Sequence, residues 1–560
     1  MISALLWLAA INVACFLPHY LLNFRERPNP FEFLRPSHAS DNRGIKLLYS
    51  KLPFSDPFRI NFDVTTGVLL AGFLGWQGGV AQVVLATVLW FGFIEITYTS
   101  VMQAVFKRPP VLGSDLALLT AGVSIVRGRL TGIVAGLLLT LSLLAWASYS
   151  IMGALLSAMP SGNVLLLVVA VALLPPCLYN LRRYPYQKVI YRSVYSPTLH
   201  FARNLEVGRG YQRMINEDAA HFAALNRFGG LTLRDAPNIV FVCIESYGGV
   251  VYTQPALRAR LAPAIERFDS QRQAAGLHVA SVLSEAPLFT GGSWLSYTTF
   301  TYGLRIDNLV LYDRLFAPDS AFAAYESVFH VLRRNGYRNH LLGPLGGVAA
   351  HDVDWDRIQR NFQADVMIDF DGLDYAGPTL PYMGLAHRFA PPDQYALNAA
   401  YERARASGAP FSLFFLTLNS HFPFDAPAAK VDDWRALNDQ DLSLDIDQSA
   451  ESDTTSRYVA AMRYELDVVT DFVADHAADD TVFVVFGDHQ PPFVATDDMG
   501  VTTPVHILSR DAELVAQFVD GGYVDGLAPE TDNTTRHEDF MPLFLDAMAR
   551  RYGHTPEEPS

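Results

Sequence analysis

Three apolar segments in the second half of the chain end in side chains that can bind a metal ion or a phosphate group. Each is followed by a carboxylate or an imidazole: Glu245, His421, and the adjacent pair Asp488 and His489. In an open α/β sheet, ligands bind beyond the carboxyl ends of the strands, so we expect these side chains to converge. Carboxylates with an imidazole form a mixed oxygen and nitrogen site, which suits Mn²⁺, Mg²⁺ or Zn²⁺ rather than a soft metal.

A serine that follows two glycines is the candidate nucleophile. Ser293 stands directly after Gly291 and Gly292, where the backbone can approach a ligand closely. A helix that begins there would direct its N-terminal N–H groups at an anion. A hydroxyl that contacts a divalent cation also loses its proton more readily. The competing interpretation is a serine that only caps a helix, which is the commoner role of such a residue.

Each of the candidate ligands also has an ordinary structural interpretation. A glutamate after a strand is usually a cap or a solvated end, and an isolated Asp-His pair is most often structural, so neither identifies a site by itself. The combination at the ends of three separate segments is what favours a metal site.

The three apolar segments are typical of strands that are buried on both faces. They are short continuous runs, rich in β-branched and aromatic residues, at 239–244, 411–418 and 481–486. Helical patterns separate them, for example at 458–474. This alternation predicts an α/β domain with a central, mostly parallel sheet.

The first third of the chain predicts a membrane domain. Apolar stretches that carry no charge apart from one glutamate cover 1–22, 64–106 and 130–181. A bilayer span needs about 20 such residues. Turn signals at 76–79 and 160–163 divide the two longer stretches, so we expect a bundle of five transmembrane helices, the second of which is short.

One charged residue lies inside these stretches. A charge there is costly unless it is paired or faces a cavity, so Glu95 is either a residue near the membrane interface or a functional group. The Lys and Arg residues between the spans lie on the same side as the large C-terminal part. The positive-inside rule alone would therefore place that part in the cytoplasm.

Charge and cysteine content argue against a nucleic acid partner and against a disulfide framework. The 560-residue chain has a formal net charge of −15, so we expect no nucleic acid partner. Its three cysteines, Cys15, Cys177 and Cys243, imply no disulfide framework. We expect a transmembrane domain at 1–183 and a connector with interfacial helices at 184–235. A catalytic domain at 236–552 and a tail at 553–560 follow.

Taken together, these segments resemble the alkaline phosphatase and sulfatase superfamily, and within it the lipoteichoic acid synthase type of phosphoglycerol transferase. The resemblance covers roughly 238–549 and the five-span anchor. It implies a sulfatase-like α/β fold in which Glu245, Ser293, Asp488 and His489 bind the metal ion. Ser293 falls where the family has its nucleophile, which is usually a threonine.

The resemblance adds further residues to the candidate site. Trp355 and Arg357 match a Trp-x-Arg element that holds the glycerol phosphate headgroup, and His421 matches a histidine that binds the substrate phosphate. Ser296 matches a serine at that spacing in the family. Because serine replaces the usual threonine at the nucleophile, Thr290 is the fallback nucleophile.

What the resemblance implies is a metal-dependent transferase. It would move a phosphoglycerol group from phosphatidylglycerol, or a related glycerophospholipid, to a glycan or polymer through a covalent intermediate on Ser293. The cofactor would be one divalent ion, Mn²⁺ by preference, with Mg²⁺ or Zn²⁺ as alternatives. The protein would be a multi-pass protein of the bacterial cytoplasmic membrane with an extracytoplasmic catalytic domain. We prefer this orientation to the one that the loop charges predict, since large domains translocate largely regardless of charge.

Three alternatives stay open. A phosphoethanolamine transferase fits less well, because that branch is rich in disulfides. A sulfatase-like phosphodiesterase or hydrolase is the second, although the residues after Ser293 lack the Cys/Ser-x-Pro-x-Arg pattern of sulfatases. The third is a non-catalytic membrane protein that keeps the fold as a binding module.

Overall fold

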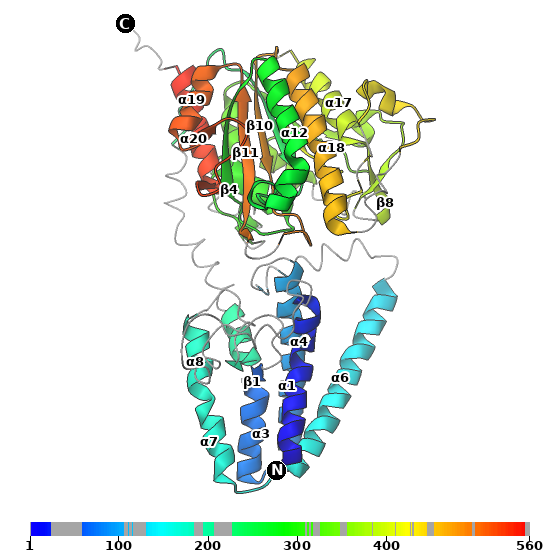
Figure 1. Cartoon of the computed structure of the whole chain (residues 1–560), viewed down its shortest axis with the longest axis vertical. Helices are drawn as coiled ribbons and strands as arrows, with labels where there is room; N and C mark the ends of the chain where they lie inside the picture. The colour runs from blue at the N-terminus through cyan, green and yellow to red at the C-terminus, as the bar shows by residue number, and fades with distance from the viewer. Residues whose placement is uncertain are drawn as a thin grey trace. The chain divides into compact units, whose positions relative to one another are not determined.

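A computed structural model shows two compact units, Met1–Arg213 and Met214–Ser560 (Figure 1). The finer boundaries expected at 183, 235 and 552 stay predictions. The structure describes the following residues: 2–23, 59–105, 110, 112, 115, 130–183, 194–205, 227–308, 311–312, 315–316, 325–347, 355–382, 385–408, 410–425, 427, 430–444, 453–495 and 499–554.

Apolar helices form the first unit at the places where the sequence predicts them. They are α1 (Ile2–Asn23), α3 (Phe62–Leu74), α4 (Val80–Val105), α6 (Leu130–Ala158), α7 (Val164–Ala172) and α8 (Leu174–Arg183). Within the described residues, three are long and apolar enough to cross a membrane, namely Ala4–Leu22, Val80–Met102 and Val134–Ala158. The stretches Phe62–Leu74 and Val164–Leu178 are apolar but shorter. The apolar bundle is confirmed, and the count of five spans remains a prediction.

Glu95 has polar partners inside the first unit. It is 5% exposed on α4, and the hydroxyl of Tyr195 donates to its two carboxylate oxygens at 2.8 and 2.9 Å. Thr99 donates to the same carboxylate at 3.0 Å. Tyr195 belongs to β2 (Val194–Tyr195), which pairs in parallel with β1 (Ile60–Asn61). These bonds meet the condition under which a carboxyl is tolerated in an apolar helix, so no ligand is needed to explain Glu95.

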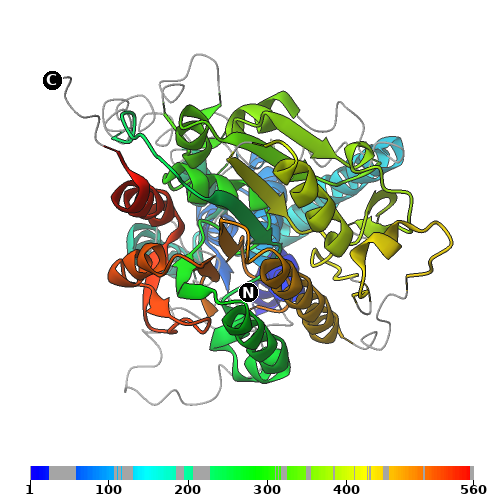
Figure 2. The same ribbon diagram turned by 90° about the horizontal axis from the view of Figure 1, so that it is seen from above.

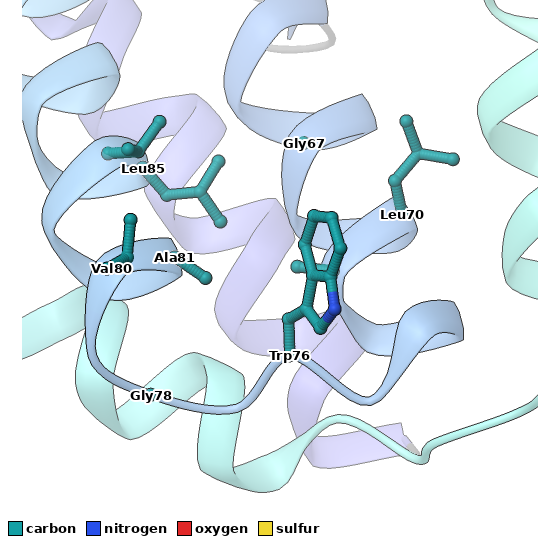
Figure 3. Close-up of a pocket in the computed structure, with 9 residues that line it drawn as sticks. Gly67, Leu70, Trp76, Gly78, Val80, Ala81 and Leu85 are labelled. Carbon is teal, nitrogen blue, oxygen red and sulfur yellow. The ribbon is translucent and has the colours of Figure 1, made fainter.

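An apolar pocket of about 600 Å³ lies beside helices α3 and α4, and Figure 3 shows its lining side chains. The lining consists of Gly67, Leu70, Ala71, Trp76, Gly78, Val80, Ala81, Val84 and Leu85. It contains no carboxylate, imidazole or hydroxyl group, so it is separate from the chemistry that the sequence predicts.

The second unit is built on a large mixed sheet. In the described residues the sheet has nine strands, with β13 beside β4 and the others in the order β12-β4-β11-β10-β3-β9-β5-β6. Strands β10, β3, β9, β5 and β6 are parallel neighbours, and β11 runs antiparallel to both β10 and β4. The prediction of a central, mostly parallel sheet is confirmed. The strand bounds are β3 Asn238–Ile244, β4 His278–Glu285, β5 Arg338–Gly343, β6 Val366–Asp369, β9 Phe411–Leu416, β10 Thr481–Gly487, β11 Thr502–Ser509, β12 Val524–Asp525 and β13 Thr534–Arg536.

Helices cover both faces of this sheet, as Figure 2 shows. One hydrophobic cluster joins one face to α12 (Pro255–Ala274), α17 (Asp393–Arg405) and α18 (Thr454–Asp475). A second joins the opposite face to α13 (Ser293–Tyr302), α15 (Val328–Arg334), α19 (Ala512–Asp520) and α20 (His537–Tyr552). Successive side chains of β3 alternate between the two clusters. This burial on both faces explains why the strand reads as an unbroken apolar run.

Register brings the ends of three strands to one edge of the sheet. Ile244 of β3 pairs with Gly487 of β10, and Cys243 of β3 pairs with Leu416 of β9. The residues that follow these strands therefore start from neighbouring positions. This places the sequence-predicted ligands at the carboxyl edge.

The loop that carries His421 is held by a buried carboxylate. Asp393, at the start of α17, accepts hydrogen bonds from the backbone N–H groups of Leu418 (2.8 Å) and Asn419 (2.7 Å). Burial raises the pKa of the neighbouring Glu465, and the charge of Asp393 raises it further. Both side chains are 0% exposed. We assign the charge to Asp393, which has two N–H donors, and the proton to Glu465.

This assignment predicts unequal costs for two substitutions. Asp393→Ala leaves the buried N–H group of Asn419 and the partly buried one of Leu418 without an acceptor and should lower the free energy of unfolding by about 2–4 kcal/mol. Glu465→Gln replaces one neutral group by another and should cost less than about 1 kcal/mol. Denaturant unfolding of the detergent-solubilised full chain measures both. An equal loss in the two variants would place the charge on Glu465 instead.

Candidate metal centre and nucleophile

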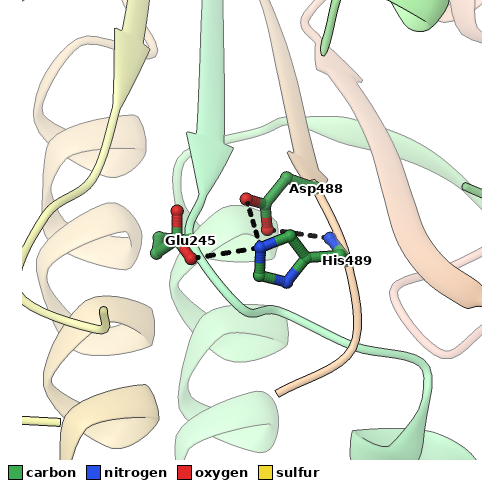
Figure 4. A group of neighbouring side chains, drawn as sticks. All are labelled: Glu245, Asp488 and His489. Atoms are coloured by element: carbon green, nitrogen blue, oxygen red, sulfur yellow. Dashed lines mark hydrogen bonds and ion pairs between the residues drawn. The ribbon is translucent and has the colours of Figure 1, made fainter. Parts of the chain in front are cut away.

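Two carboxylates and one imidazole meet at the carboxyl edge of the sheet (Figure 4). Glu245 follows β3, while Asp488 and His489 follow β10. The Nε2 atom of His489 lies 3.4 Å from Oε1 of Glu245 and 3.3 Å from Oδ2 of Asp488. One ligand atom from each residue lies within 4.8 Å of the others, and all three residues are buried. The structure thus brings these sequence-predicted ligands together.

Ser293 completes the group as the first residue of α13. Its hydroxyl donates to Oε2 of Glu245 at 3.1 Å, and its Oγ lies 3.3 Å from Nε2 of His489. Gly291 and Gly292, which precede it, have φ values of 70° and 77°. Only glycine adopts this left-handed backbone without strain, which accounts for the pair of glycines. The helix start places the positive end of α13 at the hydroxyl, a favourable place for an anion.

Hydrogen bonds orient the Asp488 carboxylate and leave one oxygen available. Its Oδ1 accepts from the backbone N–H groups of Ser246 and His489, both at 2.8 Å. Its Oδ2 is buried and, in the described part of the chain, has no hydrogen-bond partner. The hydroxyl of Ser296 donates to the backbone oxygen of Asp488 and so ties α13 to the end of β10. An oriented but unsatisfied buried oxygen is what a metal ligand needs before the ion binds.

The geometry of the other ligands also fits a divalent cation. Nδ1 of His489 lies 3.0 Å from the backbone oxygen of Gln490, so this nitrogen carries the hydrogen and Nε2 offers a lone pair. Metal bonds of about 2.1 Å in a tetrahedral site separate neighbouring ligand atoms by about 3.4 Å. The distances of 3.3 and 3.4 Å from His489 match that spacing.

Electrostatics in the metal-free cluster favour bound protons. Burial raises the pKa of Asp488 to about 7, and the charge of Glu245 adds to the rise. Burial lowers the pKa of His489, but the carboxylates of Asp488 and Glu245 more than offset it, and the net pKa is above the usual value. A divalent cation at this point would remove the cause of the raised pKa of Asp488 and of the raised pKa of His489.

His421 lies close to this cluster. Its ring packs against that of Tyr382 with centroids 4.7 Å apart, and its Nδ1 lies 2.6 Å from the backbone oxygen of Phe422. Burial lowers the pKa of His421, and the nearby charge of His489 lowers it further. The imidazole is therefore neutral near pH 7, with its hydrogen on Nδ1.

The remaining sequence-predicted site residues are Trp355, Arg357 and Thr290. Trp355 and Arg357 stand at the start of α16 (Trp355–Phe362), but their side chains lie outside the described residues. Thr290 is 4% exposed. Within the described structure the hydroxyls of Ser246 and Ser293 donate to Glu245, each at 3.1 Å, and that of Thr290 does not.

Two neighbours of the centre were missed by reasoning from the sequence. The hydroxyl of Thr417 accepts from the backbone N–H of Glu245 at 3.0 Å and pairs with Ser420 Oγ at 3.1 Å. The sequence gives only a weak signal for it, a hydroxyl residue at a strand end. Tyr382 lies in the hairpin of β7 (Leu380–Tyr382) and β8 (Leu385–Ala390), and no motif marks it.

Comparison with known proteins identifies the fold of the second unit. The sulfatase family model matches residues 237–549. No curated protein matches the chain. The expected membership of the alkaline phosphatase and sulfatase superfamily is therefore confirmed by the family match.

Three solved structures illustrate the likeness. The lipoteichoic acid synthase LtaP from Listeria monocytogenes is 14% identical, with 58% of this chain and 77% of that one covered and a TM-score of 0.35. The phosphoglycerol transferase GacH from Streptococcus pyogenes, in complex with sn-glycerol-1-phosphate, is 11% identical, with 62% and 89% covered and a TM-score of 0.36. The C-terminal periplasmic domain of EptC from Escherichia coli is 15% identical, with 50% and 75% covered and a TM-score of 0.33.

The shifted pKa values predict that metal binding depends on pH. A proton on Asp488, whose pKa is about 7, competes with the ion, so affinity should rise with pH and level off above about 7. Between pH 6 and pH 7 we expect the affinity for Mn²⁺ to increase at least about fivefold, because the deprotonated fraction of such a carboxyl grows by that factor. Isothermal titration calorimetry on the full chain measures this.

The matched control is Asp433→Asn, which removes an exposed carboxylate from the same unit and should change nothing. Affinity that is constant between pH 6 and pH 7.5 would show that the ion binds elsewhere.

Proposed function

The chain belongs to the sulfatase family, and we propose that it is a metal-dependent phosphotransferase. It moves a phosphoglycerol group from phosphatidylglycerol to a glycan or polymer through a covalent intermediate on Ser293. The observation that supports this most directly is the position of the Ser293 hydroxyl, 3.1 Å from Glu245 and 3.3 Å from His489. A helix-capping serine has no need of either partner.

The first half of the reaction forms the intermediate. Ser293 Oγ attacks the phosphorus of the lipid, the bond from phosphorus to the diacylglycerol oxygen breaks, and the proton of the serine ends on that oxygen. Glu245, Asp488 and His489 would hold a divalent cation, which would supply positive charge that favours the alkoxide and the developing charge on the phosphoryl group. The α13 N-terminus acts on the same charge.

The second half releases the product. The hydroxyl of an acceptor attacks the phosphorus, the bond to Ser293 Oγ breaks, and the acceptor's proton returns to the serine. The chain is then ready for another lipid. Water in place of the acceptor would give simple hydrolysis.

His421 would stabilise the transferring group. Its Nδ1–H bonds to the backbone oxygen of Phe422, which leaves Nε2 as the nitrogen for the substrate. The arrival of an anionic phosphoryl group favours a second proton on the ring, and Nε2 then donates to a phosphoryl oxygen. We assign the glycerol headgroup to Trp355 and Arg357 on the strength of their Trp-x-Arg pattern.

The apolar helices of the first unit anchor the enzyme in the cytoplasmic membrane, where its lipid donor resides. We place the catalytic unit outside the cytoplasm. Loop charges argue against this orientation, but they have little influence on large translocated domains.

A covalent adduct tests the proposal. After incubation with labelled phosphatidylglycerol and Mn²⁺, intact-protein mass spectrometry should show a phosphoglycerol adduct on Ser293, and chelation should abolish it. Ser293→Ala should reduce the adduct by at least about 10³-fold, since the nucleophile is lost. Ser293→Thr, which restores the residue usual in the family, should retain it.

Thr290→Val is the matched control and should form the adduct normally. An adduct on Thr290 would show that Thr290, and not Ser293, is the nucleophile. A phosphoethanolamine adduct from phosphatidylethanolamine would identify a different donor, and sulfate ester hydrolysis without any adduct would contradict the transferase.

A further inference from the structure

Phe493 is an unusual residue in the second unit. Among the described residues of that unit it is the one large apolar side chain that is exposed, at 60%. It stands four residues after His489 in the sequence, and its φ of 62° is in the left-handed region, which phenylalanine rarely adopts. A strained backbone that presents an apolar ring to solvent does not serve the fold, and such strain is concentrated at functional sites.

The ring of Phe493 is the outer end of a group of four aromatic residues, which two ring contacts and one step along the chain connect. It packs against Phe422 with centroids 4.9 Å apart, and Phe422 directly follows His421. The ring of His421 packs in turn against Tyr382 at 4.7 Å. We call these four residues the aromatic strip: Tyr382, His421, Phe422 and Phe493.

The inner end of the strip adjoins the candidate metal centre. The hydroxyl of Thr417 accepts from the backbone N–H of Glu245 and pairs with Ser420, which directly precedes His421 in the chain. Phe422, in the middle, is partly buried against the core. The strip therefore leads from the reacting groups to the protein surface.

We propose that the aromatic strip binds the diacylglycerol part of the lipid donor, with Phe493 in contact with the acyl region. This proposal rests on the proposed function. Attack by Ser293 on a phospholipid leaves an apolar diacylglycerol on one side of the phosphorus, and this group needs an apolar surface beside the metal centre. The outer members, Phe422 and Phe493, carry no hydrogen-bonding group, whereas a glycan acceptor requires polar partners.

The test compares two donors in the first half of the reaction. Adduct formation on Ser293 is measured with dioleoyl phosphatidylglycerol in mixed micelles and with glycerophosphoglycerol, the same headgroup without acyl chains. Phe493→Asn suits the left-handed backbone and should fold, because asparagine adopts this conformation readily. For the dioleoyl donor, kcat/KM should fall about tenfold or more, since apolar contact area is lost. For glycerophosphoglycerol it should change less than about twofold.

Phe493→Leu is the matched variant. It keeps an apolar side chain in the same strained backbone and should recover most of the rate with the dioleoyl donor. Its recovery separates apolar contact from an effect on the loop.

Other outcomes would overturn the assignment. An equal loss with both donors would show that Phe493 acts on the geometry of the metal centre. Normal adduct formation with slower transfer to the acceptor would show that the aromatic strip binds the acceptor and not the diacylglycerol. Weaker binding to phosphatidylglycerol vesicles with unchanged micellar rates would make Phe493 a bilayer contact. Absence of an adduct in the wild-type protein with either donor would instead refute the proposed function.

Discussion

Two carboxylates cannot share a dry site at full charge unless a cation accompanies them. Glu245 and Asp488 are 2% and 0% exposed, and their oxygens both approach the same imidazole nitrogen of His489. Buried charges without a partner cost several kcal/mol each. The fold nevertheless holds them together, because register fixes the ends of β3 and β10 side by side. Burial and the charge of Glu245 accordingly raise the pKa of Asp488.

The remainder of the second unit can be understood as support for that arrangement. Helices on both faces bury the strands, so their ends cannot drift apart. Ser296 fastens α13 to the end of β10, which fixes Ser293 at the centre. Asp393 fastens the loop that brings His421. Each contact joins segments distant in sequence, so the site exists only in the folded domain.

Reasoning from the sequence found the parts of the site that follow from strand pattern. Continuous apolar runs identify strands buried on both faces, and the residues after them must meet at one edge, so Glu245, Asp488 and His489 could be predicted. The glycine pair marked the turn before Ser293. Tyr382 and Phe493 could not be found this way, since their roles depend on a hairpin and on exposure, which no periodicity encodes. In the membrane unit, composition predicted the apolar helices, whereas their lengths leave the number of spans open.

Glu245, Ser293, Asp488 and His489 are proposed to gather around one divalent cation. Element-specific anomalous diffraction from crystals of the Mn²⁺-loaded chain, collected across the manganese absorption edge, locates the ion directly. We expect a single strong peak within about 2.0–2.3 Å of ligand atoms of Glu245, Asp488 and His489, with Ser293 Oγ as a further ligand. A peak at any other place, or none between these residues at saturating Mn²⁺, would contradict it.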